Sequence, residues 1–233
     1  MIEVATKINS TIDKEVERNI IVTKSQNTVY NIVKRLFDIV AGLIGTIILI
    51  PLTLFVIALR FIKNEHDGPI FYEQLRIGKD GKVFRFYKFR TMYIGADKKL
   101  EEYLASNKEA REEYKINKKL RNDPRITKVG KILRKTSLDE FPQFLNVLMG
   151  HMHLVGPRPY LIREKEDIGG YYKYIIQCKP GITGYWQVNG RNNTSFEKRL
   201  QCDQYYIQNK SLKLDLKIIL KTITTVIKRT GAI

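Results

Sequence analysis

Cysteine and histidine are scarce in this sequence of 233 residues, and their scarcity excludes two kinds of protein. Two cysteines, Cys178 and Cys202, are too few for a disulfide framework, and nothing near them has metal-ligand spacing. Of the histidines His66, His151 and His153, the pair His151-x-His153 could bind a metal, but no third ligand is evident. We therefore expect reduced thiols and a body that lies in the cytoplasm.

Acidic residues are also few, because 24 Asp and Glu stand against 41 Lys and Arg, for a formal net charge of +17. Such a charge requires an anionic partner, and nucleic acid, anionic phospholipid and a polyphosphorylated substrate all qualify. The basic residues are spread along the chain, with no zinc-finger spacing and no RNA-binding aromatic signature. If the chain has a membrane segment, an anionic leaflet is the simplest explanation for much of this charge.

One long uncharged run, Ile39 to Leu59, is present and contains Pro51 at its middle. Its 21 residues would form a helix of roughly 31 Å, enough to cross the hydrocarbon of a bilayer. Basic residues flank it on both sides: Lys34 and Arg35 before it, and Arg60 and Lys63 after it. Because the cytoplasmic flank of a membrane segment carries the excess of Lys and Arg, both flanks are expected on the cytoplasmic side. A segment that enters, bends at Pro51 and leaves by the same face satisfies both flanks, whereas an ordinary signal anchor with a tolerated proline is the alternative.

The rest of the chain predicts an α+β body. Short strands are expected at 70–72 and 83–87, joined by a hairpin-type connection, and a third at 182–188. Residues 96–120 are charged and predict a solvated helix or helix pair. Apolar positions at helical spacing over 212–229, with lysines between them, predict an amphipathic helix that lies either on a membrane or on the core.

Ser137-Leu138-Asp139-Glu140 is the first candidate for chemistry, at the start of a helix expected to run to Leu148. One interpretation is a capping box, with Ser137 as N-cap and Glu140 reaching back to it. The other is functional: Arg134 and Lys135 precede the two carboxylates, and this combination suits a phosphate and a hard divalent cation such as Mg²⁺. The residues alone leave both open.

Gly156-Pro157-Arg158-Pro159 is the second candidate, because two prolines fix the backbone around one arginine. A guanidinium held in this way suits a phosphate or a carboxylate, although a stiff surface turn explains the same residues. A wider set of cations falls on turns or element ends, where binding residues tend to lie: Lys88, Arg90, Arg134, Arg158 and Arg191.

In order along the chain, the motifs resemble those of the bacterial sugar transferase family, the monotopic polyprenyl-phosphate phosphoglycosyl transferases. The resemblance covers about residues 33–230. It rests on an ordered series of strings: Lys34-Arg35-x-Phe37-Asp38, the run broken at Pro51, Gly68-Pro69-x-Phe71, Arg76-x-Gly78, Lys88-Phe89-Arg90-Thr91-Met92, Asp123-Pro124-Arg125-Ile126-Thr127, Leu133 to Glu140, Val155-Gly156-Pro157-Arg158-Pro159, Pro180 to Gly184 and Gln187 to Arg191.

The resemblance implies transfer of hexose 1-phosphate from a UDP-sugar to undecaprenyl phosphate with release of UMP, an opening step of capsule, exopolysaccharide or O-antigen synthesis. It implies that Asp139 is the nucleophile, forming an aspartyl phosphosugar, and that Glu140 joins it in holding Mg²⁺. Substrate contacts carried over from the motifs are Lys88, Arg90, Arg134, Arg158 with its flanking Pro157 and Pro159, and Arg191. The segment from Ser195 to Lys217 resembles family members that transfer glucose or galactose more than members that transfer acetamido sugars.

The resemblance also implies an architecture. After an N-terminal extension over 1–32, residues 33–233 form the transferase domain. Within it, 36–62 is a re-entrant membrane helix bent at Pro51. Residues 63–233 are a mainly helical catalytic body with a small antiparallel β element and amphipathic interfacial helices, on the cytoplasmic face of the bacterial plasma membrane against anionic lipid. Homo-oligomerisation is left open.

The sequence departs from the family at one place, and two other functions compete. Gly150-His151-Met152-His153 stands where the family commonly has Gly-Asp-Met-Ser, so any helper role at position 151 is in doubt.

One competing function is a non-catalytic membrane scaffold, which predicts that the pair Asp139-Glu140 is dispensable. A membrane-anchored nucleic-acid binder predicts salt-sensitive oligonucleotide binding. Neither explains the ordered motifs, and we expect no nucleic-acid partner.

Overall fold

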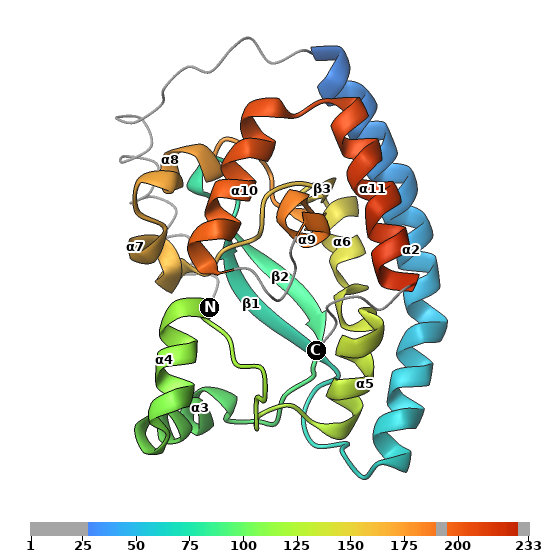
Figure 1. Ribbon diagram of the computed structural model, residues 1–233. Coiled ribbons are helices and arrows are strands. Elements are labelled where there is room, and N and C mark those ends of the chain that lie inside the picture. The colour runs from blue at the N-terminus through green and yellow to red at the C-terminus, as the bar shows by residue number, and fades with distance from the viewer. Residues whose placement is uncertain (1–27, 190–194, 228–233) are drawn as a thin grey trace.

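The structure combines one long helix with a mainly helical body around a small β element. The computed structural model describes residues 28–189 and 195–227, so most of the predicted extension lies outside the described residues. Helix α2 (Thr28–Ile62) runs along one side of the molecule, and strands β1 (Phe71–Ile77) and β2 (Val83–Phe89) lie near its centre (Figure 1). A mainly helical body with a small antiparallel sheet was predicted, and this is confirmed.

Short helices surround the strands. They are α3 (Ala96–Ser106), α4 (Lys108–Asn117), α5 (Lys128–Thr136), α6 (Gln143–Leu148), α7 (Lys165–Ile168), α8 (Tyr172–Ile175), α9 (Tyr185–Asn189), α10 (Phe196–Asn209) and α11 (Leu212–Ile227). Single 3₁₀ turns η1 to η4 lie at Lys79–Gly81, Leu138–Glu140, Ile162–Glu164 and Gly169–Tyr171. The charged segment over 96–120 forms the predicted helix pair, because Asn107 ends α3 and its side chain caps α4.

Strands β1 and β2 form an antiparallel hairpin in which Phe71 faces Phe89 and Ile77 faces Val83. A second pair, β3 (His153–Val155) and β4 (Gly181–Thr183), is parallel and was not predicted. The strand predicted over 182–188 is wrong for most of its length, because β4 ends at Thr183 and α9 follows at once. Gly181 and Gly184 approach the backbone of Gly156 so closely that a Cβ at either position would overlap it.

One face of α2 packs on the body along the whole helix. Its buried residues recur at helical spacing: Lys34, Asp38, Gly42, Gly45, Leu49, Val56 and Arg60. Gly42 and Gly45 lie against α6, where a Cβ would meet Leu148 and overlap the ring of Phe144. Further along, Leu49 and Val56 share a buried cluster with residues of β2 and α5. The helix is therefore part of the core of this body.

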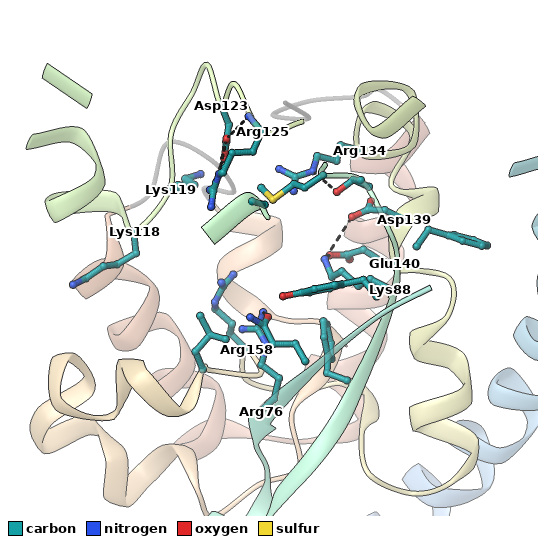
Figure 2. A pocket seen from close by; sticks show the side chains of 18 of the residues that line it. Arg76, Lys88, Lys118, Lys119, Asp123, Arg125, Arg134, Asp139, Glu140 and Arg158 are labelled. Carbon is teal, nitrogen blue, oxygen red and sulfur yellow. Dashed lines mark hydrogen bonds and ion pairs between the residues drawn. The ribbon is translucent and has the colours of Figure 1, made fainter. Parts of the chain in front are cut away.

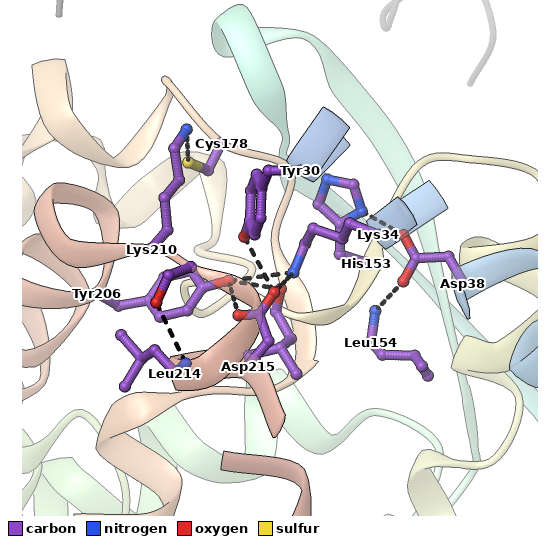
Figure 3. Close-up of polar contacts among 12 residues, drawn as sticks. Tyr30, Lys34, Asp38, His153, Leu154, Cys178, Tyr206, Lys210, Leu214 and Asp215 are labelled. Carbon is purple, nitrogen blue, oxygen red and sulfur yellow. Dashed lines mark hydrogen bonds and ion pairs between the residues drawn. The ribbon is translucent and has the colours of Figure 1, made fainter. Parts of the chain in front are cut away.

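Polar contacts fix both ends of α2 to the same body, and Figure 3 shows those near its start. There, Lys34 Nζ lies 2.6 Å from Asp215 Oδ2 of α11, and Asp38 accepts hydrogen bonds from Leu154 N and pairs with His153 Nδ1 at 2.5 Å. Near its end, Arg60 donates to the carbonyl oxygens of residues 65, 67 and 68 in the loop that follows, and Glu65 of this loop accepts hydrogen bonds from the backbone N–H groups of residues 128 and 129 in α5. Both ends of the apolar helix are thus held by one folded unit.

The opposite face of α2 is apolar and exposed. It is long and apolar enough to cross a membrane by length and composition, with most of the hydrophobic window uncovered by protein. Large side chains exposed on it include Leu36, Phe37, Val40, Leu43, Ile47, Ile50, Leu54 and Phe61. The α-helix continues through Pro51, so the bend at this residue stays a prediction.

Helix α11 is amphipathic as predicted. Asp215 and Ile218 are buried on the body, which fits the core-packing alternative. A stripe of large apolar side chains stays exposed on the other side: Leu212, Leu216, Leu220 and Ile223. The helix therefore has one face on the core and an uncovered apolar face beside α2 (Figure 1).

Candidate active site

An open cleft of about 990 Å³ lies between the β1–β2 hairpin, the α3–α4 pair and the loop after β3. Figure 2 shows carboxylates at one side of it and a group of basic side chains across from them. Most of the predicted site residues line this cleft: Lys88, Arg90, Arg134, Asp139, Glu140 and Arg158. Residues that are dispersed along the sequence are thus brought to one place by the fold.

The two carboxylates stand on a sharp turn and not on the predicted α-helix. Helix α5 ends at Thr136, Ser137 adopts a left-handed conformation with φ 58°, and the 3₁₀ turn Leu138–Glu140 follows. The capping box is wrong, because the Ser137 side chain makes no capping hydrogen bond and α6 begins only at Gln143. A non-glycine residue in this region costs roughly 1 kcal/mol, and such strain is common at functional sites.

Lys88 of β2 holds the carboxylate pair. Its Nζ lies 2.8 Å from Glu140 Oε1 and 3.5 Å from Asp139 Oδ2. Arg134 lies on the other side, where its Nε donates to Thr91 Oγ1 at 3.1 Å. The site therefore places two cations, Lys88 and Arg134, around two adjacent acids. The sequence interpretation had Lys135 in place of Lys88, but Lys135 is exposed and does not line the cleft.

Asp139 is the buried member of the pair, with 7 % of its surface exposed. Burial raises the pKa of this carboxyl and the neighbouring Glu140 raises it further, whereas Lys88 and Arg134 lower it; the net direction is upward. An ionised carboxylate here is poorly solvated and is kept charged mainly by Lys88. Such an oxygen is well suited to act as a nucleophile.

The loop that carries Arg158 is held from several sides. Asp203 of α10 is fully buried and accepts hydrogen bonds from Arg158 N at 3.0 Å and from Tyr160 Oη at 2.7 Å. The Pro157 carbonyl accepts from Gly181 N, and the Pro159 carbonyl accepts from Arg76. The two prolines therefore act through the backbone, and the fixed loop points the Arg158 guanidinium into the cleft (Figure 2).

Arg76 is a functional candidate that the sequence reasoning missed. Its Nε and that of Arg158 are buried without a hydrogen-bond partner within residues 28–189 and 195–227. Burial and the nearby charge of Arg158 lower the pKa of Arg76 to about 9. The signal was present, because Arg76 follows Gln74 on the same face of a strand, but the strand was expected to end at residue 72.

Lys119, Arg199 and Trp186 extend this basic group. Burial and neighbouring cations lower the pKa of Lys119 to about 8 and that of Arg199 to about 10. The guanidinium groups of Arg158 and Arg199 each lie 5.8 Å from the Trp186 ring. Cations that lower one another's pKa are stabilised by a bound anion, so this side of the cleft favours phosphate groups.

The remaining predicted residues lie in different places, and not all of them are in the cleft. Arg90 lines the cleft, with Nε donating to the Pro69 carbonyl at 2.9 Å. Arg191 lies outside the described residues. His151 is exposed beside Lys179, and His153 pairs with Asp38; neither lines the cleft.

The cleft holds fewer acidic ligands than a metal cage built by protein alone. Within the described ranges, no group of three or more His, Cys, Asp and Glu side chains is placed to hold a metal ion. The pair Asp139 and Glu140 still fits Mg²⁺, which usually takes one or two carboxylates from the protein and further oxygens from water and substrate phosphates. The donor set therefore suits a magnesium ion that arrives with a phosphorylated substrate.

A buried carboxylate, a facing group of cations and a body packed along an apolar helix define a class: a protein with a candidate membrane helix and a cleft suited to phosphorylated ligands. The chain belongs to the bacterial sugar transferase family, whose model matches residues 29–229. The family model thus agrees with the resemblance carried by the ordered motifs.

Three relatives illustrate the similarity. The UDP-galactose-lipid carrier transferase of Erwinia amylovora is 45% identical over 199 residues, 85% of this chain and 41% of the relative. The exopolysaccharide production protein ExoY of Sinorhizobium fredii is 44% identical, over 85% of this chain and 87% of the relative. The undecaprenyl-phosphate galactose phosphotransferase of Salmonella typhimurium is 44% identical, over 85% of this chain and 41% of the relative. The chain spans about two fifths of the length of several relatives that it matches.

Proposed function

We propose that this protein transfers a hexose 1-phosphate from a UDP-sugar to undecaprenyl phosphate and releases UMP, early in the synthesis of a capsule or exopolysaccharide. The observation that carries the proposal is the buried Asp139 carboxylate, paired with Lys88 and facing the cations around Arg158. Family membership and the names of the relatives from Erwinia and Salmonella support it. Glucose and galactose are the donors to test first.

In the first step, an Asp139 oxygen attacks the β-phosphorus of the UDP-sugar. The bond from that phosphorus to the bridging oxygen breaks, and UMP leaves with the electron pair. In the second step, a phosphate oxygen of undecaprenyl phosphate attacks the same phosphorus. The acyl phosphate bond breaks, the Asp139 carboxylate is restored, and the lipid carries the sugar diphosphate. Covalent catalysis of this kind splits one difficult transfer into two easier ones.

The surrounding side chains keep the nucleophile charged and neutralise the phosphates. Lys88 lowers the pKa of Asp139, so more of the carboxylate is ionised near neutral pH. Arg76 and Arg158 present buried nitrogens without partners in the described ranges, and these suit the oxygens of a diphosphate. Mg²⁺ held by Asp139 and Glu140 would supply further charge neutralisation for the departing UMP.

We also propose that α2 enters the bilayer from the cytoplasmic face and returns to it. The support is that Lys34 near its start pairs with Asp215 of the body, and Val56 near its end packs with Val129 and Leu133 of α5. A body joined to both ends of one helix cannot lie in both aqueous compartments. The exposed apolar faces of α2 and α11 then contact lipid, and Pro51 is the natural place for a bend.

The proposal is tested by UMP release from purified full-length protein with undecaprenyl phosphate, Mg²⁺ and either UDP-glucose or UDP-galactose. We expect release with one hexose donor and a loss of at least about 10³-fold in turnover for Asp139→Asn. Glu102→Gln, an exposed change on α3, is the matched control and keeps full activity. Undiminished release by Asp139→Asn would show that this carboxylate is only structural. No release with hexose or acetamido donors would reject the transferase function.

A further inference from the structure

A second, smaller cavity lies beside the start of α2 and belongs to no function described above. It has a volume of about 260 Å³ and shares no lining residue with the cleft. Cations dominate its described lining: Lys34, Arg35, Lys79, Lys179 and Lys210. None of its described lining residues is Asp or Glu. This cavity is therefore a concave, strongly positive site with no anion built into its wall.

The two buried acids nearest to this cavity are already occupied. Asp215 pairs with Lys34, and its Oδ1 accepts a hydrogen bond from the Tyr206 hydroxyl at 2.7 Å (Figure 3). Asp38 is bound by His153 and by Leu154 N. Each acid thus already has a cationic or hydrogen-bonding partner in direct contact, and neither forms an ion pair with Lys79 or Lys179 within the described residues.

The remaining cations find no carboxylate in the part of the chain that the structure describes. Arg35 donates to the carbonyl oxygens of Val147 and Leu148, and Lys210 Nζ lies 3.4 Å from the thiol of Cys178. Lys79 and Lys179 form no ion pair within the described residues. Burial lowers the pKa of Lys179, and the nearby charges of Arg35 and Lys79 lower it further, whereas Asp38 raises it. A bound anion would relieve this repulsion.

The position of the cavity indicates which anion it takes. The same turns of α2 that supply Lys34 and Arg35 carry exposed apolar side chains on their other side, including Val29, Ile32 and Leu36. An anion in the cavity would thus lie at the edge of the proposed lipid-facing surface. A phosphate attached to acyl chains fits both the basic cavity and the apolar face of α2, because the headgroup contacts the cations and the chains contact the apolar side chains.

We propose that this cavity binds the phosphate headgroup of an anionic membrane phospholipid. The site is separate from the cleft in which the transfer would occur. The proposal depends on the membrane placement of α2 within the proposed function but not on any transferase activity.

The test is native mass spectrometry of full-length, delipidated protein in detergent, titrated with phosphatidylglycerol or phosphatidylcholine. We expect one phosphatidylglycerol to bind per chain, with clear preference over phosphatidylcholine. Lys79→Gln/Lys179→Gln is expected to weaken this binding about tenfold or more, because two charge-assisted contacts are lost. Lys79→Arg/Lys179→Arg keeps both charges and should retain binding.

Lys98→Gln/Lys108→Gln is the matched control, because it removes the same charge from exposed positions on α3 and α4. Equal loss in the control and pocket variants would overturn the proposal, since it would reduce the effect to net charge. Equal binding of the two lipids would also overturn it. A third arm adds inorganic phosphate: displacement of the lipid at phosphate concentrations close to those of the lipid would assign the cavity to a free phosphate instead. Because the readout is binding, failure of the transferase assay would leave this result interpretable.

Discussion

At the residue scale, the site depends on one lysine that pairs with the proposed nucleophile and on one buried acid that supports a loop. Lys88 bridges Asp139 and Glu140, and Asp203 holds the backbone of Arg158 from α10. The two acids differ in their neighbours. Asp139 faces the cleft beside two cations, whereas Asp203 is enclosed and bonded to a backbone amide and a phenol. Their substitutions should therefore separate catalysis from stability.

Replacing the lysine should reduce turnover in a pH-dependent way. In Lys88→Met, the pKa of Asp139 rises further because its main opposing charge is lost, so less of the nucleophile is ionised at neutral pH. We expect kcat to fall about tenfold to a hundredfold near pH 7 and part of the loss to be recovered at higher pH. Rates of UMP release across pH measure this. Lys98→Met is the control, because Lys98 is exposed on α3 and does not line the cleft; an identical pH profile in both variants would contradict the role of Lys88.

Asp203 gives a prediction about stability. Burial raises its pKa to about 7, above the value of about 4 expected in the unfolded chain. The folded state therefore binds this proton more tightly, and the stability that it contributes is present below about pH 4 and is lost as pH rises to about 7.

Asp203→Asn removes this titration while keeping an acceptor for Arg158 N and Tyr160 Oη. The difference in melting temperature between variant and wild type should accordingly shift in favour of the variant between pH 5 and pH 7.5. Thermal unfolding in detergent at the two pH values measures the difference. A constant difference would mean that Asp203 is ionised in the folded protein throughout this range.

At the scale of elements, α2 is held by a buried ion pair as well as by apolar packing. Lys34 and Asp215 are 7 % and 6 % exposed, so each depends on the other for its charge. Lys34→Met would leave the carboxylate of Asp215 buried without its cation, although Tyr206 and Tyr30 still donate to it.

We expect Lys34→Met to lower the free energy of unfolding by about 3 kcal/mol or more, and Lys34→Met/Asp215→Leu to recover much of it. Thermal or denaturant unfolding of the two variants in the same detergent gives the comparison. Additive losses in the double variant would show that the two residues act independently and would contradict the pairing.

The sequence predicted some elements well, for identifiable physical reasons. The β1–β2 hairpin, the α3–α4 pair and α11 follow from local periodicity and turn residues, which are properties of neighbouring residues. The turn at Ser137 was misjudged because Ser137 and Glu140 match a capping box, while the long-range contact of Glu140 with Lys88 overrides the local preference. Strand β4 was misjudged because its pairing with β3 joins residues far apart in the chain.

The residues of the site could be predicted only in part, because the fold brings some of them together from distant parts of the chain. Asp139, Glu140, Lys88, Arg134 and Arg158 were found because they lie in motifs that resemble a family. Arg76 also lies in such a motif but was missed because the strand was expected to end at residue 72. Lys119 and Trp186 reach the cleft from separate parts of the chain, and no spacing in the sequence indicates that they converge. The predicted contact from Arg191 falls in the segment 190–194, outside the described residues.

At the scale of the whole molecule, the membrane arrangement makes a direct prediction. Cysteines introduced as Thr28→Cys and Asn64→Cys, in a background of Cys178→Ala and Cys202→Ser, mark the two ends of α2. If α2 enters and leaves by one face, both should react with a membrane-impermeant maleimide only after the cells are permeabilised. Reaction of one of them in intact cells would place the ends of α2 on opposite faces and would reject the re-entrant arrangement.

The basic residues behind the net charge of +17 are distributed unevenly over the molecule. Part of it gathers across the cleft from Asp139, and part of it surrounds the second cavity near the start of α2. The structure thus separates cations suited to a soluble nucleotide from cations suited to the membrane surface. A single basic patch of the kind used for nucleic acid would not require two separate concave sites.

The packing of α2 has a consequence for how the protein is made. Leu49 and Val56 close the hydrophobic cluster that Phe89, Val129 and Leu133 form beneath the turn of Asp139. A nascent chain whose anchor has not yet been inserted lacks this support, and so does a fragment cut after α2. Under the proposed membrane placement and transferase function, insertion of α2 and completion of the site would therefore be coupled, and unanchored copies of the protein would not consume nucleotide sugar in the cytosol.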